Sequence, residues 1–311
     1  MSTPDAPDAF PTETHPLDAL PTERPNPRTA DLDRLDTLGV LGRIGDQDAT
    51  VAAAVRAALP EIAGAVDLAL ERWRRGGRIV LFGAGTSGRL ATLDAAELIP
   101  TFGTPSERYV ARIAGGREAL WRPIEGAEDD RAGGAAAAGD LGADDLALGI
   151  AASGRTPWVI AALEEARRRG AATVGLACVP RPLLAAACDV VIAVDTGPEA
   201  VAGSTRMKAG TAQKLALNAF STALMVRLGK VYRNLMVDLR ATNQKLRRRA
   251  LRLVRQCTDA DEAAAAEALA AAGGSVKLAI AMLRLALPAD EAARRLEQAE
   301  GHLARALGEL A

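Results

Sequence analysis

The chain has 311 residues, which is enough for one large domain with appendages or for two domains. Hydrophobic residues make up 49% of the sequence and aromatic residues only 3%, so the core must be built from aliphatic side chains. The formal net charge of −1 argues against a large nucleic-acid surface, and two histidines, one near each terminus, argue against histidine catalysis. Three scattered cysteines form neither a disulfide framework nor a zinc site and fit a reducing compartment.

The first residues have the composition of a tail rather than of a targeting segment. Residues 1–27 hold seven of the 16 prolines together with acidic residues, and they lack the basic start and apolar stretch of a signal peptide. We expect a disordered Pro-rich tail over residues 1–21. No run of about 18 apolar residues occurs along the chain, so no transmembrane helix is predicted.

The next segment is helical in its periodicity. Leucine and isoleucine recur at helical spacing from residue 32 to residue 44, and two further amphipathic helices are predicted over about 47–59 and 61–75. We expect Pro60 to end the first of these two helices and Gly76-Gly77 to end the second.

Short β-rich runs then alternate with helices. Strands are predicted over residues 78–82, 109–113, 146–150, 173–176 and 190–194, with helices over about 156–169 and 205–228. This alternation predicts an α/β fold, a three-layer αβα sandwich around a five-stranded parallel, flavodoxin-like sheet. Residues from about 232 are expected to be helical, with three short helices after 259. The chain is therefore predicted to divide into a helical segment over 22–68, an α/β domain over 69–232 and a helical domain over 233–311.

The first predicted strand runs into a glycine-rich loop that opens a helix. Gly83, Gly85 and Gly88 fit the dinucleotide pattern G-x-G-x-x-G. That pattern needs an acidic residue at the end of the next strand, where this chain has alanine and two glycines, so we disfavour a nucleotide site. Thr86 and Ser87 instead place two hydroxyl groups in the loop, where they can bond a phosphate or a sugar.

The third predicted strand ends in a second such loop, again before a helix. Ser153 and Thr156 can each bond a phosphate, and Gly154 lets the backbone approach closely. Helix N-termini offer free N–H groups and a positive dipole end, which favour anions. Helix capping by Ser153 and Thr156 explains either loop alone equally well. In a 2-1-3-4-5 strand order, however, strands 1 and 3 are neighbours at the switch point, so both loops face one crevice.

This arrangement resembles the sugar isomerase (SIS) domain, whose members bind phosphosugars through such serine loops. Further motifs resemble the N-acetylmuramic acid 6-phosphate etherase family, in order, over about residues 22–311. They are residues 22–29 (TERPNPRT), 83–90 (GAGTSGRL), 94–97 (DAAE), 125–129 (EGAED), 151–157 (AASGRTP), 203–214 (GSTRMKAGTAQK) and 234–238 (NLMVD). Gly45 stands where the family is expected to have asparagine.

The resemblance implies a bacterial cytoplasmic homodimer in cell-wall amino-sugar recycling, without metal or redox cofactor, that releases D-lactate and N-acetylglucosamine 6-phosphate. It assigns the two catalytic carboxylates to Glu97 and Glu128, with Glu97 as the proton donor. From spacing alone, an ordinary surface glutamate and a solvated acidic loop would be the simpler interpretations. The expected substrate-binding residues come from the two loops and from the start of the long helix. They are Gly85, Thr86, Ser87, Ser153, Gly154, Arg155, Thr156, Ser204, Arg206 and Lys208.

The chemistry that the resemblance implies needs one base, one acid and a phosphate anchor. In the open-chain sugar the C2 proton is acidified by the C1 aldehyde, and the lactyl ether oxygen is on C3. Removal of the C2 proton and protonation of lactate give elimination, after which water adds at C3. Because only five of the 38 basic residues are lysines, Lys208 and Lys214 are notable near one helix start, and Lys208 is one candidate for the lactyl carboxylate.

Two other functions remain open at this point. An aldose–ketose isomerase of the SIS type would share proton removal at C2 without elimination. A non-enzymatic phosphosugar sensor would bind the ligand without turnover, although the related glucokinase regulatory proteins carry two SIS units and this chain shows one. The N-terminal helices lack a basic recognition helix, which disfavours a SIS transcription regulator.

Overall fold

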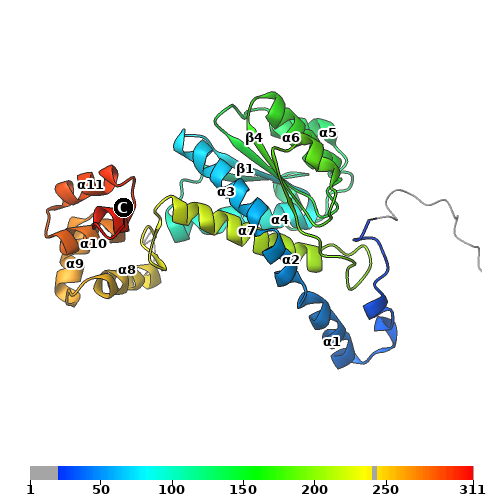
Figure 1. Ribbon diagram of the computed structural model, residues 1–311, viewed down its shortest axis with the longest axis horizontal. Coiled ribbons are helices and arrows are strands. Elements are labelled where there is room, and N and C mark those ends of the chain that lie inside the picture. Colours follow the sequence, from blue (N-terminus) through cyan, green and yellow to red (C-terminus); the bar gives the residue numbers. More distant parts are fainter. Residues whose placement is uncertain (1–19, 240–243, 311) are drawn as a thin grey trace, which may run out of the picture.

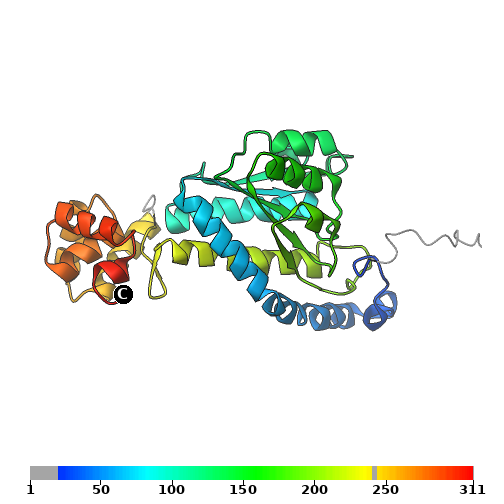
Figure 2. The same cartoon turned by 45° about the horizontal axis from the view of Figure 1, so that its top comes forward.

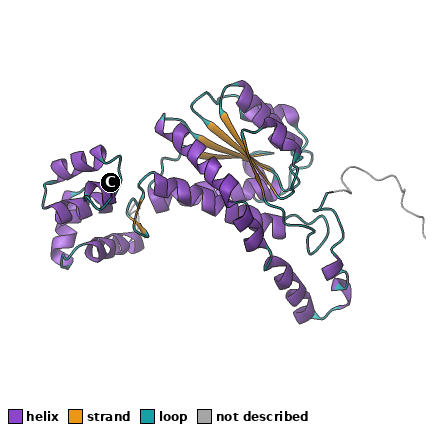
Figure 3. Cartoon of the chain, viewed as in Figure 1, coloured by secondary structure: helices purple, strands orange, loops and turns teal. Residues whose placement is uncertain are grey.

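The computed structural model describes residues 20–239 and 244–310 (Figure 1), so nearly all of the predicted tail lies outside the described residues. Helices dominate the chain on both sides of the sheet, as Figure 3 shows. The α-helices are α1 (Thr37–Asp48), α2 (Val51–Ala57), α3 (Leu59–Arg74), α4 (Gly85–Phe102), α5 (Arg131–Ala137), α6 (Pro157–Arg168), α7 (Lys208–Arg227), α8 (Gln244–Cys257), α9 (Glu262–Ala271), α10 (Val276–Leu285), α11 (Ala289–Gln298) and α12 (Leu303–Ala306).

Five parallel strands form the central sheet in the order β2-β1-β3-β4-β5. They are β1 (Ile79–Gly83), β2 (Tyr109–Ile113), β3 (Leu146–Ile150), β4 (Ala172–Ala177) and β5 (Val190–Ala193). Strands β1, β3 and β4 are buried along their whole length, as expected for a sheet covered on both faces. The predicted fold class is confirmed, including the flavodoxin-like strand order.

Alternate residues of β1 enter two different hydrophobic clusters. Ile79 and Leu81 pack with α2, α3, α4 and α7 on one face, whereas Val80 and Phe82 pack with α6 on the other. The period-2 alternation of strand side chains therefore divides the core into two layers of helix contact. Figure 2 shows the resulting sandwich with α3, α4 and α7 below the sheet and α6 above it.

The N-terminal helices begin at different residues from those predicted. The prediction of one helix over 47–59 is wrong at its start, because α1 continues to Asp48 and α2 covers only Val51–Ala57. Pro60 does not end a helix; it lies in the first turn of α3, where a missing N–H costs no hydrogen bond. Helix α7 likewise begins at Lys208 rather than at 205, because residues 204–207 form turns.

The C-terminal region has its own hydrophobic cluster, which runs from Tyr232 to Ala306. The prediction of helix from 232 onward is wrong at its start, because Val231–Tyr232 (β6) and Leu235–Met236 (β7) pair as a short antiparallel hairpin. The three short helices after residue 259 are present as α9, α10 and α11, and the four-residue α12 follows them.

No single helix among the described residues is long and apolar enough to cross a membrane. Two bent helix pairs reach the necessary length and apolar composition only when their two helices are taken together; they are Thr37–Ala57 with Leu59–Arg74 and Glu262–Ala271 with Val276–Leu285.

Candidate functional site

The two serine loops lie side by side at the carboxyl edge of the sheet. Strands β1 and β3 are hydrogen-bonded neighbours, and Gly83 at the end of β1 is directly opposite Ile150 at the end of β3. Neighbouring strands are about 4.8 Å apart, so the loops that leave these two residues can contact one compact ligand.

The first loop ends in an uncapped helix N-terminus. Gly85 begins α4 with φ of +52°, a conformation that glycine adopts without strain, and Ala84 offers no capping side chain. The first intrahelical bond is the one from Gly88 N to Ala84 O, which leaves the N–H groups of the first turn without helical partners. These groups and the helix dipole together favour an anion. Thr86 is half-buried beside them.

Ser87 is buried, and its hydroxyl is not free. Ser87 Oγ donates to Oε1 of Gln213 on α7 at 3.0 Å, across 126 residues of sequence. This contact attaches the first loop to the second turn of α7.

The second loop is folded tightly around Gly154. Gly154 has φ of +67°, and a Cβ at this position would lie 2.2 Å from Cβ of Pro182, so glycine is required. Ser153, Arg155 and Thr156 are half-buried, and Ser153 Oγ accepts a 3.3 Å hydrogen bond from Arg155 N. Ser153 and Thr156 thus place two hydroxyl groups directly before α6.

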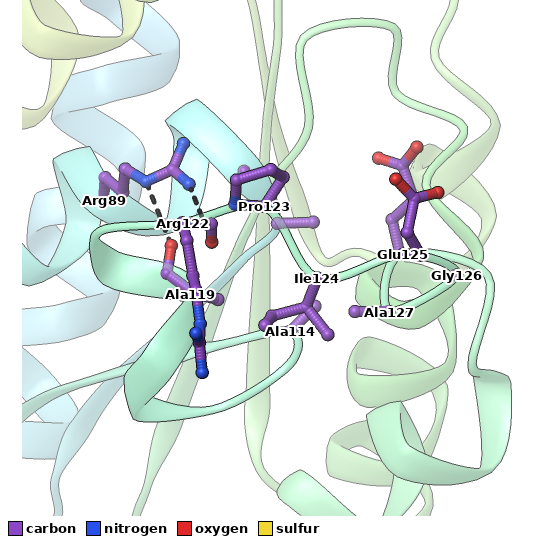
Figure 4. A pocket seen from close by; sticks show the side chains of 12 residues that line it. Arg89, Ala114, Ala119, Arg122, Pro123, Ile124, Glu125, Gly126 and Ala127 are labelled. Atoms are coloured by element: carbon purple, nitrogen blue, oxygen red, sulfur yellow. Dashed lines mark hydrogen bonds between the residues drawn. The ribbon is translucent and has the colours of Figure 1, made fainter.

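A pocket of about 270 Å³ opens between the first loop and the segment that links β2 to α5. Its lining residues are Ala84, Gly85, Arg89, Ala114, Ala119, Arg122, Pro123, Ile124, Glu125, Gly126, Ala127 and Glu128. Figure 4 shows Arg89 and Arg122 on one side of this pocket and Glu125 on the other. Arg89 Nε donates to the carbonyl oxygens of Ala119 and Leu120, which fixes the linking segment.

Glu128 lies in this pocket with an exposed side chain and an anchored backbone. Its carbonyl oxygen accepts a 2.9 Å hydrogen bond from Trp158 N in the first turn of α6. Since α6 begins directly after the second loop, the structure brings Glu128 together with both serine loops.

Glu97 does not join this group within one chain. Helix α4 runs from Gly85 to Phe102 as one element, and Glu97 is exposed twelve residues after Gly85. At 1.5 Å per residue it lies about 18 Å along the helix axis from the first loop.

The three site residues predicted at the start of the long helix differ in how exposed they are. Ser204 is half-buried and Arg206 is exposed, both in the turns before α7. Lys208 is buried; its Nζ donates to the Pro198 carbonyl at 3.0 Å and lies 3.4 Å from Gln47 Oε1. Burial lowers the pKa of Lys208, while the nearby Glu199 raises it. Its ammonium group thus bonds oxygen atoms within the chain.

Three buried polar residues on or beside α4 and α7 were not predicted from the sequence. Glu199 is fully buried and accepts hydrogen bonds from the backbone N–H groups of Lys208 and Ala209, which caps α7. Asp94, three residues before Glu97, accepts hydrogen bonds from Tyr109 and Ser221. Burial raises the pKa of the Asp94 carboxyl, against the lowering effect of these two hydroxyl donors. Gln213 is the third.

In the sequence, the only sign that Asp94 and Gln213 matter is that they lie within the motifs at 94–97 and 203–214. Their contacts with Ser221 and Ser87 join distant segments of the chain and could not be predicted. Residues 20–239 and 244–310 contain no group of three or more His, Cys, Asp or Glu side chains that could hold a metal ion.

Known proteins match nearly the whole chain. Family models match residues 61–167 (glucokinase regulatory protein N-terminal SIS domain), 132–223 (SIS domain) and 233–277 (C-terminal lid domain of glucokinase regulatory protein). The N-acetylmuramic acid 6-phosphate etherase of Deinococcus radiodurans is 53% identical over 93% of this chain and 95% of its own length. Those of Mycolicibacterium smegmatis (52%; 94% and 99%) and Symbiobacterium thermophilum (56%; 86% and 89%) are similarly close.

The chain belongs to the N-acetylmuramic acid 6-phosphate etherase family. The resemblance drawn from the motifs is therefore confirmed, and the SIS region includes both serine loops and Glu128. In this etherase fold, the pocket joins a helix N-terminus suited to an anion with a carboxylate on its rim.

Proposed function

We propose that this chain cleaves the D-lactyl ether of N-acetylmuramic acid 6-phosphate, giving N-acetylglucosamine 6-phosphate and D-lactate. Relatives of that name are more than 50% identical to it over most of their length. The structural observation that carries the proposal is the pocket in which the uncapped α4 N-terminus and Glu128 meet. A carbon–oxygen lyase acting on a phosphorylated amino sugar needs an anion site and a proton-transfer group that reach the same ligand.

The two loops hold the phosphate in this proposal. The first-turn N–H groups of α4, with Thr86 and Ser87, bond the phosphoryl oxygens from one side, and Ser153 and Thr156 bond them from the other. Gly85 and Gly154 let the backbone approach the ligand, and Arg155 adds positive charge at the start of α6. Ser204 and Arg206 lie in the turns before α7 and contact the sugar or its lactyl group. Lys208 serves instead to fix the start of α7.

The reaction uses Glu128 as base and Glu97 as acid. Glu128 takes the C2 proton of the open-chain aldehyde, the C3–O bond breaks, and lactate leaves with a proton from Glu97. Water then adds to the double bond at C3, and a proton returns to C2. The net change is the addition of one water molecule across the ether bond, so no oxidant or reductant is required, and the two carboxylates supply the proton transfers.

Glu97 reaches this chemistry from a second copy of the chain. Helices α4 and α7 run parallel and adjacent, since Ser87 bonds Gln213 and Asp94 bonds Ser221. Leu93 (44%) on α4 and Leu215 (37%) and Val226 (43%) on α7 are exposed apolar side chains, which a two-fold interface would bury. The end of α4 then enters the partner's crevice, which supplies the missing acid and makes the active unit a homodimer.

The remaining organisation follows the same proposal. We divide the chain into a helical segment over 22–68, the SIS domain over 69–232 and the C-terminal helices over 233–311, after a Pro-rich tail. The enzyme acts in the cytoplasm in cell-wall amino-sugar recycling, where phosphorylated sugars are made and retained.

Lactate release from N-acetylmuramic acid 6-phosphate by the purified protein tests this function. We expect turnover without added metal or nucleotide, and the same rate in EDTA. Activity that EDTA abolishes and a divalent ion restores would contradict the carboxylate mechanism. Conversion of an aldose phosphate to a ketose phosphate without lactate release would favour an isomerase, and binding without turnover would favour a sensor.

A further inference from the structure

The contact between Ser87 and Gln213 is buried and incompletely bonded. Ser87 is 7% exposed and Gln213 is 1% exposed. Ser87 Oγ donates to Gln213 Oε1 at 3.0 Å, whereas Nε2 of the same amide is buried and has no partner within residues 20–239 and 244–310. An unpaired buried amide nitrogen costs free energy, so its presence at the phosphate loop calls for a reason.

This arrangement directs the Ser87 hydroxyl away from an anion. A serine hydroxyl has one hydrogen to donate and two lone pairs. When the hydrogen points to Gln213, only lone pairs face the first loop, and phosphate oxygens are themselves acceptors. Ser87 in this state contributes repulsion rather than a hydrogen bond.

Rotation of the Gln213 amide by half a turn reverses the direction of donation. Nε2 then donates to Ser87 Oγ, and the hydroxyl hydrogen is free to donate to a phosphate oxygen. The Ser87–Gln213 hydrogen bond is kept in either orientation, with donor and acceptor exchanged. A bound anion therefore decides the orientation, and the chain of two donors strengthens its hold on that anion.

We propose that Gln213 is a positioning residue that sets the direction of the Ser87 hydroxyl and so makes the first loop selective for a phosphoryl anion. This inference rests on the proposed phosphate site. It assigns to α7 a part in substrate binding through a side chain that never touches the substrate.

Substitutions that fix the direction of donation test the idea. Glutamate at position 213 keeps the shape of glutamine, but its carboxylate only accepts, so it holds the Ser87 hydrogen inward. We expect Gln213→Glu to raise KM for N-acetylmuramic acid 6-phosphate about tenfold or more, with kcat little changed. Gln213→Met leaves Ser87 free to donate outward but removes the second donor, so we expect its KM to lie above that of the wild type and below that of Gln213→Glu.

A double-mutant cycle separates this effect from simple charge repulsion. Ser87→Ala should raise KM by itself, and adding Gln213→Glu to it should then raise KM little further. An equal rise in both backgrounds would mean that the glutamate repels phosphate directly, which overturns the proposal. A folded Gln213→Met variant with KM as high as that of Ser87→Ala overturns it as well.

The cycle also shows which proposal fails. If Ser87→Ala leaves KM unchanged, Ser87 does not bind phosphate, and the phosphate site of the proposed function is wrong together with this inference. If Ser87→Ala raises KM but Gln213→Glu does not, only the inference about Gln213 is wrong. Thermal unfolding of each variant provides the check on folding, and Gln213→Met decides the matter alone if Gln213→Glu does not fold.

Discussion

Glu97 and Glu128 carry the same carboxyl group but occupy different settings. Glu128 stands on a linking segment whose backbone is bonded to α6, at the rim of the pocket. Glu97 is on a long helix, exposed and about 18 Å from the first loop by helix rise. A base close to the phosphate site and an acid brought from elsewhere are consistent with these positions.

We expect Glu97→Gln and Glu128→Gln each to lower kcat by on the order of 10² to 10⁴, because each removes a proton-transfer group from the transition state. Loss of Glu128 should also stop exchange of the C2 proton with solvent deuterium, whereas loss of Glu97 should spare it. Lactate release and NMR of the C2 position measure the two effects. Glu107→Gln, at the opposite edge of the sheet, is the matched control. Reversed exchange results would exchange the two roles.

Ser153 offers a test of the second loop. Its half-buried hydroxyl accepts a hydrogen bond from Arg155 N, and leucine at this position would remove the hydroxyl and fill the space before α6. We expect Ser153→Leu to raise KM about ten- to hundredfold, the value of one charge-assisted hydrogen bond, with the fold intact. Ser106→Leu, on an exposed loop before β2, should leave KM unchanged. An unchanged KM in Ser153→Leu would remove this serine from the phosphate site.

For individual residues, the sequence predicted which residue types form the candidate site better than it predicted where their side chains point. Composition marked Lys208 as unusual, but charge content does not show that its ammonium group bonds Pro198 inside the chain. Gln213 and Asp94 were missed because Ser87, the partner of Gln213, and Ser221, one of the two partners of Asp94, are each more than 120 residues away in sequence. Such contacts arise only when α4 and α7 pack together.

Among the elements, the first turn of α4 shows how tightly the first loop is held. A Cβ at Gly88 would lie 2.5 Å from Ile113 Cγ1 and 2.7 Å from the Gly83 carbonyl oxygen. The third glycine of the loop is therefore required for the approach of α4 to the ends of β1 and β2, whatever the ligand.

Gly88→Ala should lower the free energy of unfolding by about 1–3 kcal/mol, because the backbone at Gly83 cannot move away easily. Gly64→Ala is its matched control, since Gly64 is exposed within α3 and a Cβ there meets nothing within 4 Å. That control should gain about 0.5–1 kcal/mol, as alanine does in a helix interior. Urea unfolding of both variants measures the difference, and equal effects would contradict the close packing described here.

Prediction of the elements succeeded where periodicity is strong. All five strands of the sheet lie within two residues of their predicted bounds, because β-rich runs alternate with helices and end in glycine loops. The β6–β7 hairpin was missed, since two residues per strand give no period to detect. Pro60 was misread because proline both ends helices and begins them, and only the surrounding structure decides which.

For the whole molecule, the separation between Glu97 and the serine loops demands an explanation. The helix that carries Glu97 does not break before it, so bending of α4 does not shorten the path. The proposed interface between two copies of the chain would bring Glu97 to the serine loops and would cover the exposed Leu93, Leu215 and Val226.

Subunit complementation tests this arrangement. Glu97→Gln and Ser153→Leu are each inactive or weak alone, and subunits of the two are mixed and allowed to exchange. If Glu97 acts across the interface, one site of each mixed dimer carries both defects and the other carries none, so up to about half of the activity per dimer returns. Mass analysis confirms the exchange. Mixed dimers without recovered activity would show that Glu97 serves its own chain.

The separate C-terminal cluster has a consequence for the cooperativity of unfolding. Its apolar contacts run from Tyr232 to Ala306, and the ion pair from Arg74 to Glu300 that links it to α3 is exposed. Exposed pairs contribute only about 0–1 kcal/mol, so this pair does little to couple the melting of the two cores. We expect heat to unfold α8 to α12 as one unit before the sheet, which thermal unfolding followed by calorimetry measures as two transitions. The serine loops and Glu128 belong to the sheet edge and would stay folded through that first transition. The protein would then still bind its ligand at temperatures at which any contribution of the C-terminal helices to turnover is already lost.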